Sequence, residues 1–297
     1  MAAQIIDGKQ VAADMREELK KEVAKLKEQG VVPGLGVILV GEDPASKSYV
    51  TAKERTCEEI GIYSDDNRLA PDTSQQELMA LVERMNKDPK IHGILVQLPL
   101  PKHLNETEVL LSIDPAKDVD GFHPMNVGKM VVGEESFLPC TPHGVIQLLV
   151  RSGVTIEGAE VVIVGRSNIV GKPLANMLIQ KKPQRNATVT VCHTRTKDLA
   201  AHTRRADILI AAAGRPNTIT ADMVKEGVVV IDVGVNRVED ATKKRGYRLV
   251  GDVDFEAVKE KASLITPVPG GVGPMTITML MYNTVESARR TIARTSQ

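Results

Sequence analysis

The sequence predicts a two-domain α/β protein, and three observations support this fold class. The chain has 297 residues, and a length of about 150 residues per domain gives an expectation of two domains. Short apolar runs alternate with amphipathic segments, which is typical of a mostly parallel sheet covered by helices. Glycines, prolines and short polar stretches interrupt this alternation at 121–144, where we expect the passage between the domains.

In the N-terminal half, the predicted elements follow from the spacing of apolar residues and from helix-stopping glycines. Apolar residues recur every three or four positions at 10–29, so we expect a helix that stops at Gly30. An apolar run between glycines predicts a strand at 35–40, and a second run, stopped by Pro99, predicts a strand at 91–98. Further helices are expected at 44–60, where Gly61 ends the pattern, and at 75–86 and 105–112.

The alternation resumes in the C-terminal half. Apolar runs predict strands at 161–164, 187–191, 207–211 and 228–233, and a helix is expected after Gly171. A loop rich in glycine and proline follows at 267–274, and a final helix is expected from about residue 275 to about residue 293.

The composition excludes several classes of protein. Lys plus Arg and Asp plus Glu each number 38, so the net charge is zero, and we expect no nucleic-acid partner and no membrane partner. The three cysteines form no closely spaced pair and the histidines form no helical HxxxH pair, so we expect a reducing compartment and no metal. No secretory signal and no apolar run of roughly 20 residues is present, which predicts a cytoplasmic protein, although a matured organelle protein would look the same.

The turn at 165–171 is a candidate dinucleotide site, because it joins an apolar strand to a helix. Compared with the Gly-x-Gly-x-x-Gly pattern, Ser167 replaces the second glycine and Gly171 falls one position late. A dinucleotide-binding turn and a plain strand-to-helix turn therefore both stay open. A phosphate-loop ATPase is excluded, because five residues separate Gly165 from Gly171 and Pro173 follows Lys172.

The end of the next predicted strand favours NADP over NAD. NAD sites usually carry a carboxylate there for the ribose hydroxyls. This chain instead has Thr194 and Arg195 at that position, and Arg166 lies in the glycine turn. Hydroxyl and guanidinium donors suit the 2′-phosphate of NADP, although a solvated turn with scattered charge would look similar.

Candidate catalytic residues lie in the N-terminal half. Tyr49 and Lys53 are four residues apart on a predicted helix and share its face. Burial on this partly apolar face would lower the pKa of Lys53 toward values useful for catalysis, whereas a solvated surface lysine is the plainer interpretation. Gln97 ends a predicted strand, where ligands collect, or is a satisfied core amide. Asp118 and Asp120 lie two positions apart in a predicted loop, where we expect them to cap a turn, to bind a cation or to accept hydrogen bonds from substrate N–H groups, and turn capping is the plainest of these interpretations.

Several motifs, taken in order, resemble the bifunctional methylenetetrahydrofolate dehydrogenase/methenyltetrahydrofolate cyclohydrolase family. The resemblance runs from about residue 5 to about residue 290. The motifs that carry it are Ser48-Tyr-Val-x-x-Lys53, Gly93-Ile-Leu-Val-Gln97-Leu-Pro-Leu-Pro101, Asp118-Val-Asp120-Gly-Phe-His-Pro124, Pro139-Cys-Thr-Pro-x-Gly144, Gly165-Arg-Ser-x-Ile-Val-Gly171 and Ile265-Thr-Pro-Val-Pro-Gly-Gly-Val-Gly-Pro-Met-Thr276.

The resemblance implies two reactions of one-carbon metabolism, which supplies purine biosynthesis. NADP would take a hydride from 5,10-methylenetetrahydrofolate, and water would then open the methenyl product to 10-formyltetrahydrofolate. It also implies a homodimer, a C-terminal Rossmann-like NADP domain at 123–274, and an N-terminal α/β folate domain at 1–122 that the last helix, 275–297, completes.

The resemblance also assigns roles to residues. Lys53 would be the main catalytic residue, Gln97 would tune it, Tyr49 would orient the folate, and Asp120 would accept hydrogen bonds from the pterin. Further substrate-binding residues would be Val96, Leu98, Pro269, Gly270, Gly271, Val272 and Gly273. The NADP-binding residues would be Gly165, Arg166, Ser167, Thr194 and Val235, to which we add Arg195 on the basis of its charge.

Two alternatives stay open from the sequence. A monofunctional dehydrogenase would lack the hydrolysis step, but the presence of both Lys53 and Gln97 favours the bifunctional enzyme. A non-catalytic NADP sensor would not need Tyr49, Lys53, Gln97 and Asp120 together. The basic segment 181–186 departs from the family pattern, and we expect a surface loop there unless it alters the grip on the cofactor.

Overall fold

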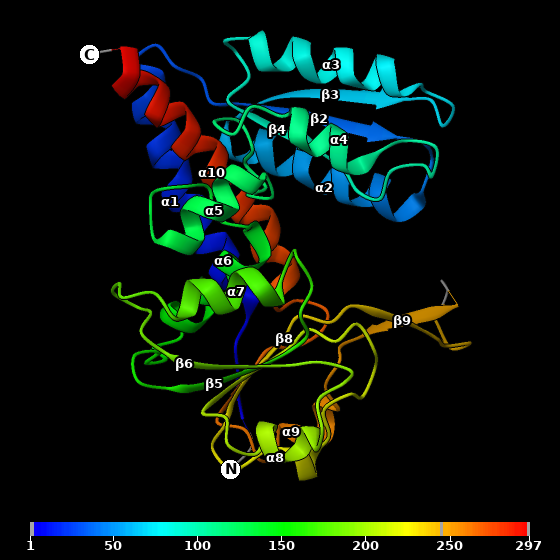
Figure 1. Cartoon of the computed structure of the whole chain (residues 1–297), viewed down its shortest axis with the longest axis vertical. Coiled ribbons are helices and arrows are strands. Elements are labelled where there is room, and N and C mark those ends of the chain that lie inside the picture. Colours follow the sequence, from blue (N-terminus) through cyan, green and yellow to red (C-terminus); the bar gives the residue numbers. More distant parts are fainter. Residues whose placement is uncertain (1–2, 244–245, 296–297) are drawn as a thin grey trace. The chain divides into compact units, whose positions relative to one another are not determined.

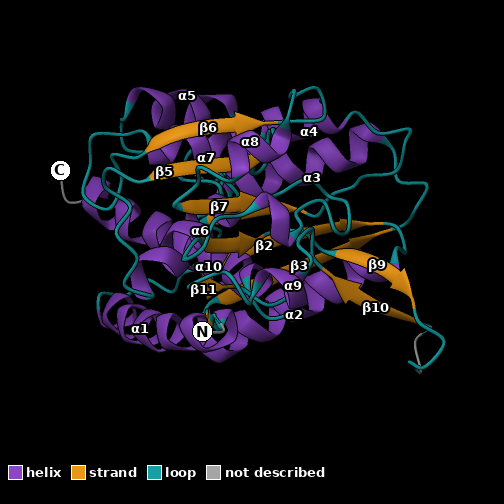
Figure 2. Cartoon of the chain, turned by 90° about the horizontal axis from the view of Figure 1, so that it is seen from below, coloured by secondary structure: helices purple, strands orange, loops and turns teal. Residues whose placement is uncertain are grey.

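The computed structural model describes residues 3–243 and 246–295, which form two compact units (Figures 1 and 2). The three-stranded unit comprises Ala13–Cys140 and the chain from Ile277 onward. The six-stranded unit comprises the chain up to Ala12 and Thr141–Thr276. Among the described residues, no helix is both long and apolar enough to cross a membrane.

The three-stranded unit is built on a parallel sheet in the order β3-β2-β4. Its strands are β2 (Gly34–Val40), β3 (Tyr63–Leu69) and β4 (Gly93–Val96). The helices α3 (Gln75–Lys87) and α4 (Glu106–Ser112) pack on the face of the sheet that carries Ile38 and Ile94. The helix α2 (Pro44–Ile60) covers the opposite face (Figure 1).

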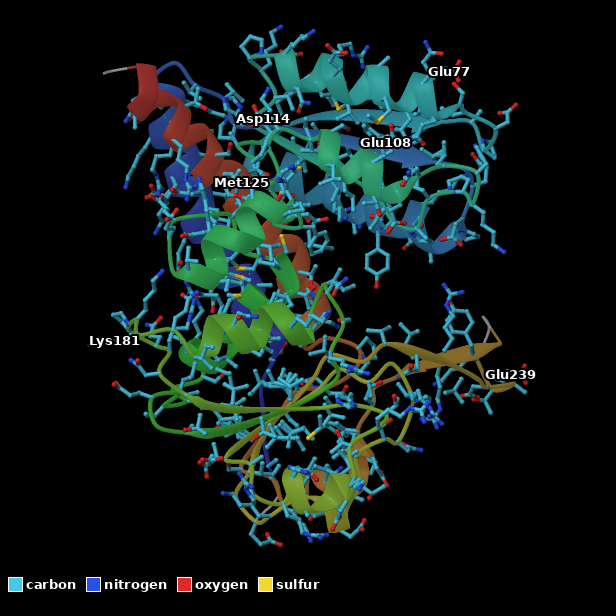
Figure 3. All side chains as sticks on the ribbon, in the orientation of Figure 1. Glu77, Glu108, Asp114, Met125, Lys181 and Glu239 are labelled. Atoms are coloured by element: carbon cyan, nitrogen blue, oxygen red, sulfur yellow. The ribbon has the colours of Figure 1, made fainter. Side chains whose placement is uncertain are left out.

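The helix ends in this unit follow local capping rules. Pro44 begins α2 behind the N-cap Asp43, and Gly61 ends it with a φ of 88°, a left-handed conformation that suits glycine. At the start of α3, the side chains of Ser74 and Glu77 form a reciprocal capping box; Glu77 is labelled in Figure 3. These caps fix where α2 and α3 begin, and thereby the position of every side chain along them.

Three more helices complete the three-stranded unit. These are α1 (Gly8–Glu28), α5 (Pro124–Val132) and the last helix, α10 (Val272–Thr295), of which α1 and α10 begin in the six-stranded unit. Arg289 of α10 forms an ion pair with Glu22 of α1, with 3.1 Å between nitrogen and oxygen. The expectation that the last helix completes the N-terminal α/β domain is therefore confirmed.

The six-stranded unit contains a sheet in the order β1-β11-β8-β7-β5-β6, in which every neighbouring pair is parallel. Figure 2 shows β6, β5 and β7 side by side. The strands are β1 (Gln4–Ile5), β5 (Glu160–Val164), β6 (Thr188–Cys192), β7 (Ile208–Ala211), β8 (Val229–Asp232) and β11 (Leu264–Ile265). This arrangement confirms the predicted Rossmann-like domain.

Shorter elements surround this sheet. The helices are α6 (Cys140–Arg151), α7 (Gly171–Leu178), α8 (Leu199–Thr203) and α9 (Phe255–Val258), with a 3₁₀ turn, η1, at Ala221–Met223. The strands β9 (Asn236–Glu239) and β10 (Tyr247–Val250) pair antiparallel outside the main sheet. Because the main strands are parallel, their carboxyl ends, and the loops that follow them, share one edge.

The structure differs from the sequence-based interpretation in two places. The interval 121–144, expected as a passage between domains, contains α5 and the first residues of α6. The units divide after residues 12, 140 and 276, rather than after residues 122 and 274. Residues up to Ala12 join the six-stranded unit because β1 pairs with β11, and α5 stays with the three-stranded unit because Asn126 binds the carboxylate of Asp118.

Candidate functional site

In the three-stranded unit, α2 holds the two predicted side chains in different environments. Lys53 is only 8% exposed, whereas the ring of Tyr49, one turn earlier, is 47% exposed. Burial lowers the pKa of Lys53, the direction that the sequence pattern predicted, while the charge of Asp120 and the thiols of Cys140 and Cys57 oppose that change. Lys53 is therefore a buried amine and not a solvated surface lysine.

The buried amine of Lys53 is held by Gln97, directly after β4. Nζ of Lys53 donates to Oε1 of Gln97 over 2.9 Å, and Nε2 of Gln97 donates to the carbonyl oxygen of Leu98 over 2.8 Å. The backbone N–H of Gln97 donates to Ile38 in β2. With both ends of its amide engaged, Gln97 presents its oxygen to Lys53 in one orientation. Its neighbours Val96 and Leu98 are buried and half-buried.

A carboxylate completes this cluster. Asp120 interacts electrostatically with Lys53 and with the thiol of Cys140, which donates a hydrogen bond of 3.4 Å to the carbonyl oxygen of the preceding residue, Val119. Burial raises the pKa of Asp120, whereas the positive charge of Lys53 and the nearby thiol lower it. Burial also raises the pKa of Cys140, so this thiol stays protonated and remains a donor. The sequence analysis missed Cys140, although it lies in the Pro139-Cys-Thr-Pro motif.

Asp118 shapes the turn that carries Asp120. Its carboxylate, 3% exposed, accepts hydrogen bonds from the backbone N–H groups of Gly121, Phe122 and His123 and from Nδ2 of Asn126. The turn-capping interpretation of Asp118 is therefore the right one. Burial raises the pKa of Asp118 to about 6, against the lowering effect of these donors.

In the six-stranded unit, the turn after β5 approaches its neighbours too closely for any residue but glycine. A Cβ on Gly165, whose φ is 136°, would lie 2.0 Å from the carbonyl oxygen of Ala212, and one on Gly171 would lie 2.1 Å from the carbonyl oxygen of Gly165. Arg166 and Ser167 are exposed between these glycines. The hydroxyl of Ser167 accepts a hydrogen bond from the backbone N–H of Val170, the N-cap of α7, and the carbonyl oxygen of Ser167 accepts one from the backbone N–H of Lys172. The turn therefore places the exposed side chains of Arg166 and Ser167 beside the positive end of a helix.

The other predicted cofactor residues lie at the same edge of this sheet. Thr194 and Arg195 follow β6, and Val235 follows β8; all three are exposed. The basic segment 181–186 lies at the opposite edge, because it precedes β6; Figure 3 shows Lys181 at this position. It is a loop whose residues 181–184 are exposed, as expected, and it does not reach the predicted cofactor residues.

Two buried carboxylates organise this edge, and the sequence analysis missed both. Asp252 accepts hydrogen bonds from Ala213, Gly214 and Arg215 in the loop after β7, and Asp232 accepts from Gly234, Asp252 and Val253. Burial raises the pKa of Asp232 to about 6. In the sequence, each aspartate lies close to a glycine, in Asp232-Val-Gly234 and in Gly251-Asp-Val253, and this pattern was the available signal. The structure explains the glycines, because a Cβ on Gly234 would overlap the carboxylate of Asp252 and a Cβ on Gly251 would overlap that of Asp232.

The loop at 269–273 belongs to the six-stranded unit. Pro269 and Gly273 are exposed, Gly270 is half-buried, and Gly271 and Val272 are buried. Val272 and Gly273 already form the first turn of α10. A Cβ on Gly8 would lie 1.8 Å from the carbonyl oxygen of Gly271, so the N-terminus of α1 packs directly on this loop.

The donors at the sheet edge fit a dinucleotide. Exposed guanidinium and hydroxyl groups surround a tight glycine turn at a helix N-terminus, where a pyrophosphate binds in proteins of this class, and no carboxylate follows β6 directly. Within the ranges that the structure describes, no group of three histidine, cysteine, aspartate or glutamate residues could hold a metal ion. The fold and these two clusters together define a dinucleotide-dependent α/β enzyme.

Comparison with known proteins identifies the family. Residues 6–120 match the tetrahydrofolate dehydrogenase/cyclohydrolase catalytic domain, and residues 139–292 match the NAD(P)-binding domain of the same family. The chain therefore belongs to the tetrahydrofolate dehydrogenase/cyclohydrolase family.

Individual relatives agree with this assignment. The bifunctional protein FolD of Syntrophus aciditrophicus is 65% identical over 97% of this chain and 98% of its own. The bifunctional FolD methylenetetrahydrofolate dehydrogenase/cyclohydrolase of Campylobacter jejuni is 52% identical, with a TM-score of 0.92 over 98% of this chain and 100% of its own. The Trypanosoma brucei enzyme, solved with NADP and an inhibitor, is 40% identical, with a TM-score of 0.92 over 98% and 99%.

Proposed function

We propose that this chain uses NADP to oxidise 5,10-methylenetetrahydrofolate, and that Lys53 manages the proton in hydrolysis of the methenyl product to 10-formyltetrahydrofolate. By its family and its close relatives, the chain is a bifunctional methylenetetrahydrofolate dehydrogenase and methenyltetrahydrofolate cyclohydrolase of one-carbon metabolism. The observation that carries the residue assignment is the cluster in which the buried amine of Lys53 donates a hydrogen bond to Gln97 and interacts electrostatically with Asp120.

The hydrolysis step requires a proton acceptor near the attacked carbon. Water that adds to the methenyl carbon must lose a proton, and the lowered pKa of Lys53 makes its neutral amine, the form that can accept this proton, more accessible than that of a solvated lysine. Gln97 fixes the position of that amine. Asp120 would accept hydrogen bonds from pterin N–H groups, and the exposed ring of Tyr49 is free to pack on the folate. Val96, Leu98 and the loop 269–273 are the further candidates for substrate contact.

The oxidation step needs no protein base. A nitrogen lone pair of the folate stabilises the cation that remains when a hydride leaves, and bound NADP supplies the hydride acceptor. Within the six-stranded unit, the turn at Gly165 and the side chains of Arg166, Ser167, Thr194 and Arg195 would hold the cofactor, with Val235 beside it. Support for NADP comes from the basic end of β6, which has no carboxylate, and from the NADP bound in the Trypanosoma brucei relative.

The assignment of the units and of the assembly follows from the same proposal. The three-stranded unit would carry the folate chemistry and the six-stranded unit the cofactor. A homodimer and a cytoplasmic location remain predictions. The location is supported by three cysteines that are buried and unpaired in the structure. Sedimentation velocity would test the dimer.

The test supplies purified protein with 5,10-methylenetetrahydrofolate and either NADP or NAD. Reduced cofactor and 10-formyl product are followed together, and a Lys53→Met variant is measured beside the native protein. We expect both products with NADP and no catalysed 10-formyl product from the variant. Reduced cofactor without catalysed hydrolysis would instead indicate a monofunctional dehydrogenase, and cofactor binding without turnover would indicate a sensor.

A further inference from the structure

One amide on the last helix holds the backbone on both sides of the cluster around Lys53. Asn283 of α10 is 3% exposed. Its Nδ2 donates to the carbonyl oxygens of Val119, over 2.8 Å, and Leu138, over 3.0 Å, and lies 3.8 Å from Sγ of Cys140. Val119 precedes Asp120 in the chain, and its carbonyl oxygen also accepts a hydrogen bond of 3.4 Å from Sγ of Cys140.

On the other side of Asp120, the residue that follows it, Gly121, also packs against the backbone at 137–139. Gly121 adopts a φ of 75°, and a Cβ there would lie 2.7 Å from the carbonyl carbon of Leu138 and from the nitrogen of Pro139. The backbone at 119–121 therefore lies directly on the backbone at 137–139. The carboxylate of Asp118 closes the turn beyond Gly121, so Asn283 supplies the clamp on the side before Asp120.

We propose that Asn283 is a positioning residue that sets the place of the Asp120 carboxylate for folate binding and for its interaction with Lys53. This inference rests on the proposed role of Asp120 in holding the pterin. Asn283 acts through the backbone. It fixes the peptide before Asp120 and, through Leu138, the segment that brings the Cys140 thiol to the same peptide. This positioning role also gives a functional reason why α10 returns to the three-stranded unit.

The same helix offers a matched control. Ser287 lies one turn further along α10 and is 5% exposed. Its hydroxyl donates to the carbonyl oxygens of His92, over 2.6 Å, and Ala116, over 3.0 Å. Ser287 therefore also ties α10 to two backbone segments of the unit, but neither segment is the loop at 119–121. A purely structural effect would appear equally in variants at both positions.

The experiment compares Asn283→Ala, Ser287→Ala and Asp120→Asn in the full chain. For Asn283→Ala, we expect the KM for folate to rise about tenfold in both reactions, because a hydrogen-bonded carboxylate is displaced, while the KM for NADP changes less than about twofold. Ser287→Ala should lower the midpoint of thermal unfolding to a similar extent and leave both KM values unchanged. If Asn283→Ala does not fold, Asn283→Ser, which keeps a donor hydroxyl, provides the same comparison.

A pH profile gives a second readout that a structural role would not move. The groups that act on the Lys53 amine are Asp120, which raises its pKa, and the thiols of Cys140 and Cys57. Displacement of Asp120 should therefore shift the Lys53-dependent limb of the cyclohydrolase profile to lower pH in Asn283→Ala and not in Ser287→Ala.

The outcomes separate the inference from the proposed function. If Asn283→Ala matches Ser287→Ala in folate KM and in pH profile, while Asp120→Asn weakens folate binding, only the positioning role of Asn283 is overturned. If Asp120→Asn itself binds folate as the native protein does, the role proposed for Asp120 fails, and the inference fails with it.

Discussion

Lys53 in the middle of α2 donates a 2.9 Å hydrogen bond to Gln97 at the end of β4, although 44 positions separate the two residues. The acceptor oxygen cannot rotate away without breaking the second bond of the amide, to the carbonyl oxygen of Leu98. The pair therefore joins a helix on one face of the three-stranded sheet to the carboxyl end of the outer strand β4, and it fixes a buried amine in one place.

Substitution of Gln97 should separate the two activities. In Gln97→Met, Lys53 loses its neutral acceptor, so the amine is no longer fixed, and we expect the cyclohydrolase rate to fall roughly 100-fold, within the range of general acid–base effects. The dehydrogenase rate should fall much less, because hydride loss needs no protein base. Both rates are measured on the same preparation, with 5,10-methenyltetrahydrofolate supplied directly for hydrolysis.

Asn86 provides the control for that comparison. Its amide also makes two hydrogen bonds, to the backbone of Ser112 and Asp114, but neither partner belongs to the Lys53 cluster. Asn86→Ala should lower thermal stability and leave the ratio of the two activities unchanged. An equal loss of both activities in Gln97→Met would contradict the role given to Gln97.

The stability of the protein should depend on the ionisation of Asp118. Its pKa is raised from 3.8 to about 6 by burial, so between these values the folded chain holds a proton that the unfolded chain has lost. The resulting stabilisation is fully present below pH 3.8 and is lost as pH rises through 6. The difference in pKa corresponds to about 3 kcal/mol.

The Asp118→Asn variant isolates this effect, because its side chain does not titrate. We expect the free energy of unfolding of the native protein, minus that of the variant, to fall by up to about 3 kcal/mol from pH 4 to pH 7. Urea unfolding followed by circular dichroism at several pH values gives this difference. A difference that does not vary with pH would show that Asp118 titrates normally in the folded chain.

Much of the fold could be predicted where local signals suffice. The bounds of α2 match the prediction, because Pro44 begins the helix and Gly61 stops it. The strand β3 was missed, because its sequence, Tyr-Ser-Asp-Asp-Asn-Arg-Leu, is polar and lies at the edge of its sheet with alternating exposure. Only pairing along the full length of β2 makes it a strand, and pairing of this kind is not a local property.

The residues of the candidate site likewise fall into those that local sequence signals predict and those that they do not. Tyr49 and Lys53 share a helical face, and the residues from Gly165 to Gly171 form a local turn, so both groups could be found from spacing. Asn283 and Val119 are 164 positions apart, and Asp252 reaches a loop about 38 positions earlier. No periodicity signals contacts of this length, and only the tertiary fold brings these groups together.

The glycine turn gives a prediction that concerns the cofactor alone. In Gly171→Ala, the new Cβ would lie 2.1 Å from the carbonyl oxygen of Gly165, so the turn must shift. We expect the KM for NADP to rise at least about tenfold, while hydrolysis of supplied 5,10-methenyltetrahydrofolate stays within about twofold of the native rate. Gly128→Ala is the control, since a Cβ at that position meets nothing within 4 Å.

The preference for NADP should reside in the arginines at the edge of the six-stranded sheet. Arg166 and Arg195 are exposed on the loops that follow the neighbouring strands β5 and β6. A guanidinium group at this position can form a bidentate hydrogen-bonded pair with the 2′-phosphate of NADP. For Arg166→Ala and Arg195→Ala, we expect the KM for NADP to rise about 10- to 100-fold, as the loss of a charged hydrogen bond predicts. The KM for NAD, which lacks the phosphate, should stay within about twofold.

The ratio of the two KM values decides which arginine binds the phosphate. If both variants weaken NADP and NAD equally, the arginines bind a group that the two cofactors share, such as the pyrophosphate. If only one variant changes the ratio, that residue alone reads the phosphate. Thr194→Asp provides a converse test, because a carboxylate at the end of β6 would repel the phosphate and accept the free ribose hydroxyls. We therefore expect this single substitution to raise the KM for NADP and lower the KM for NAD.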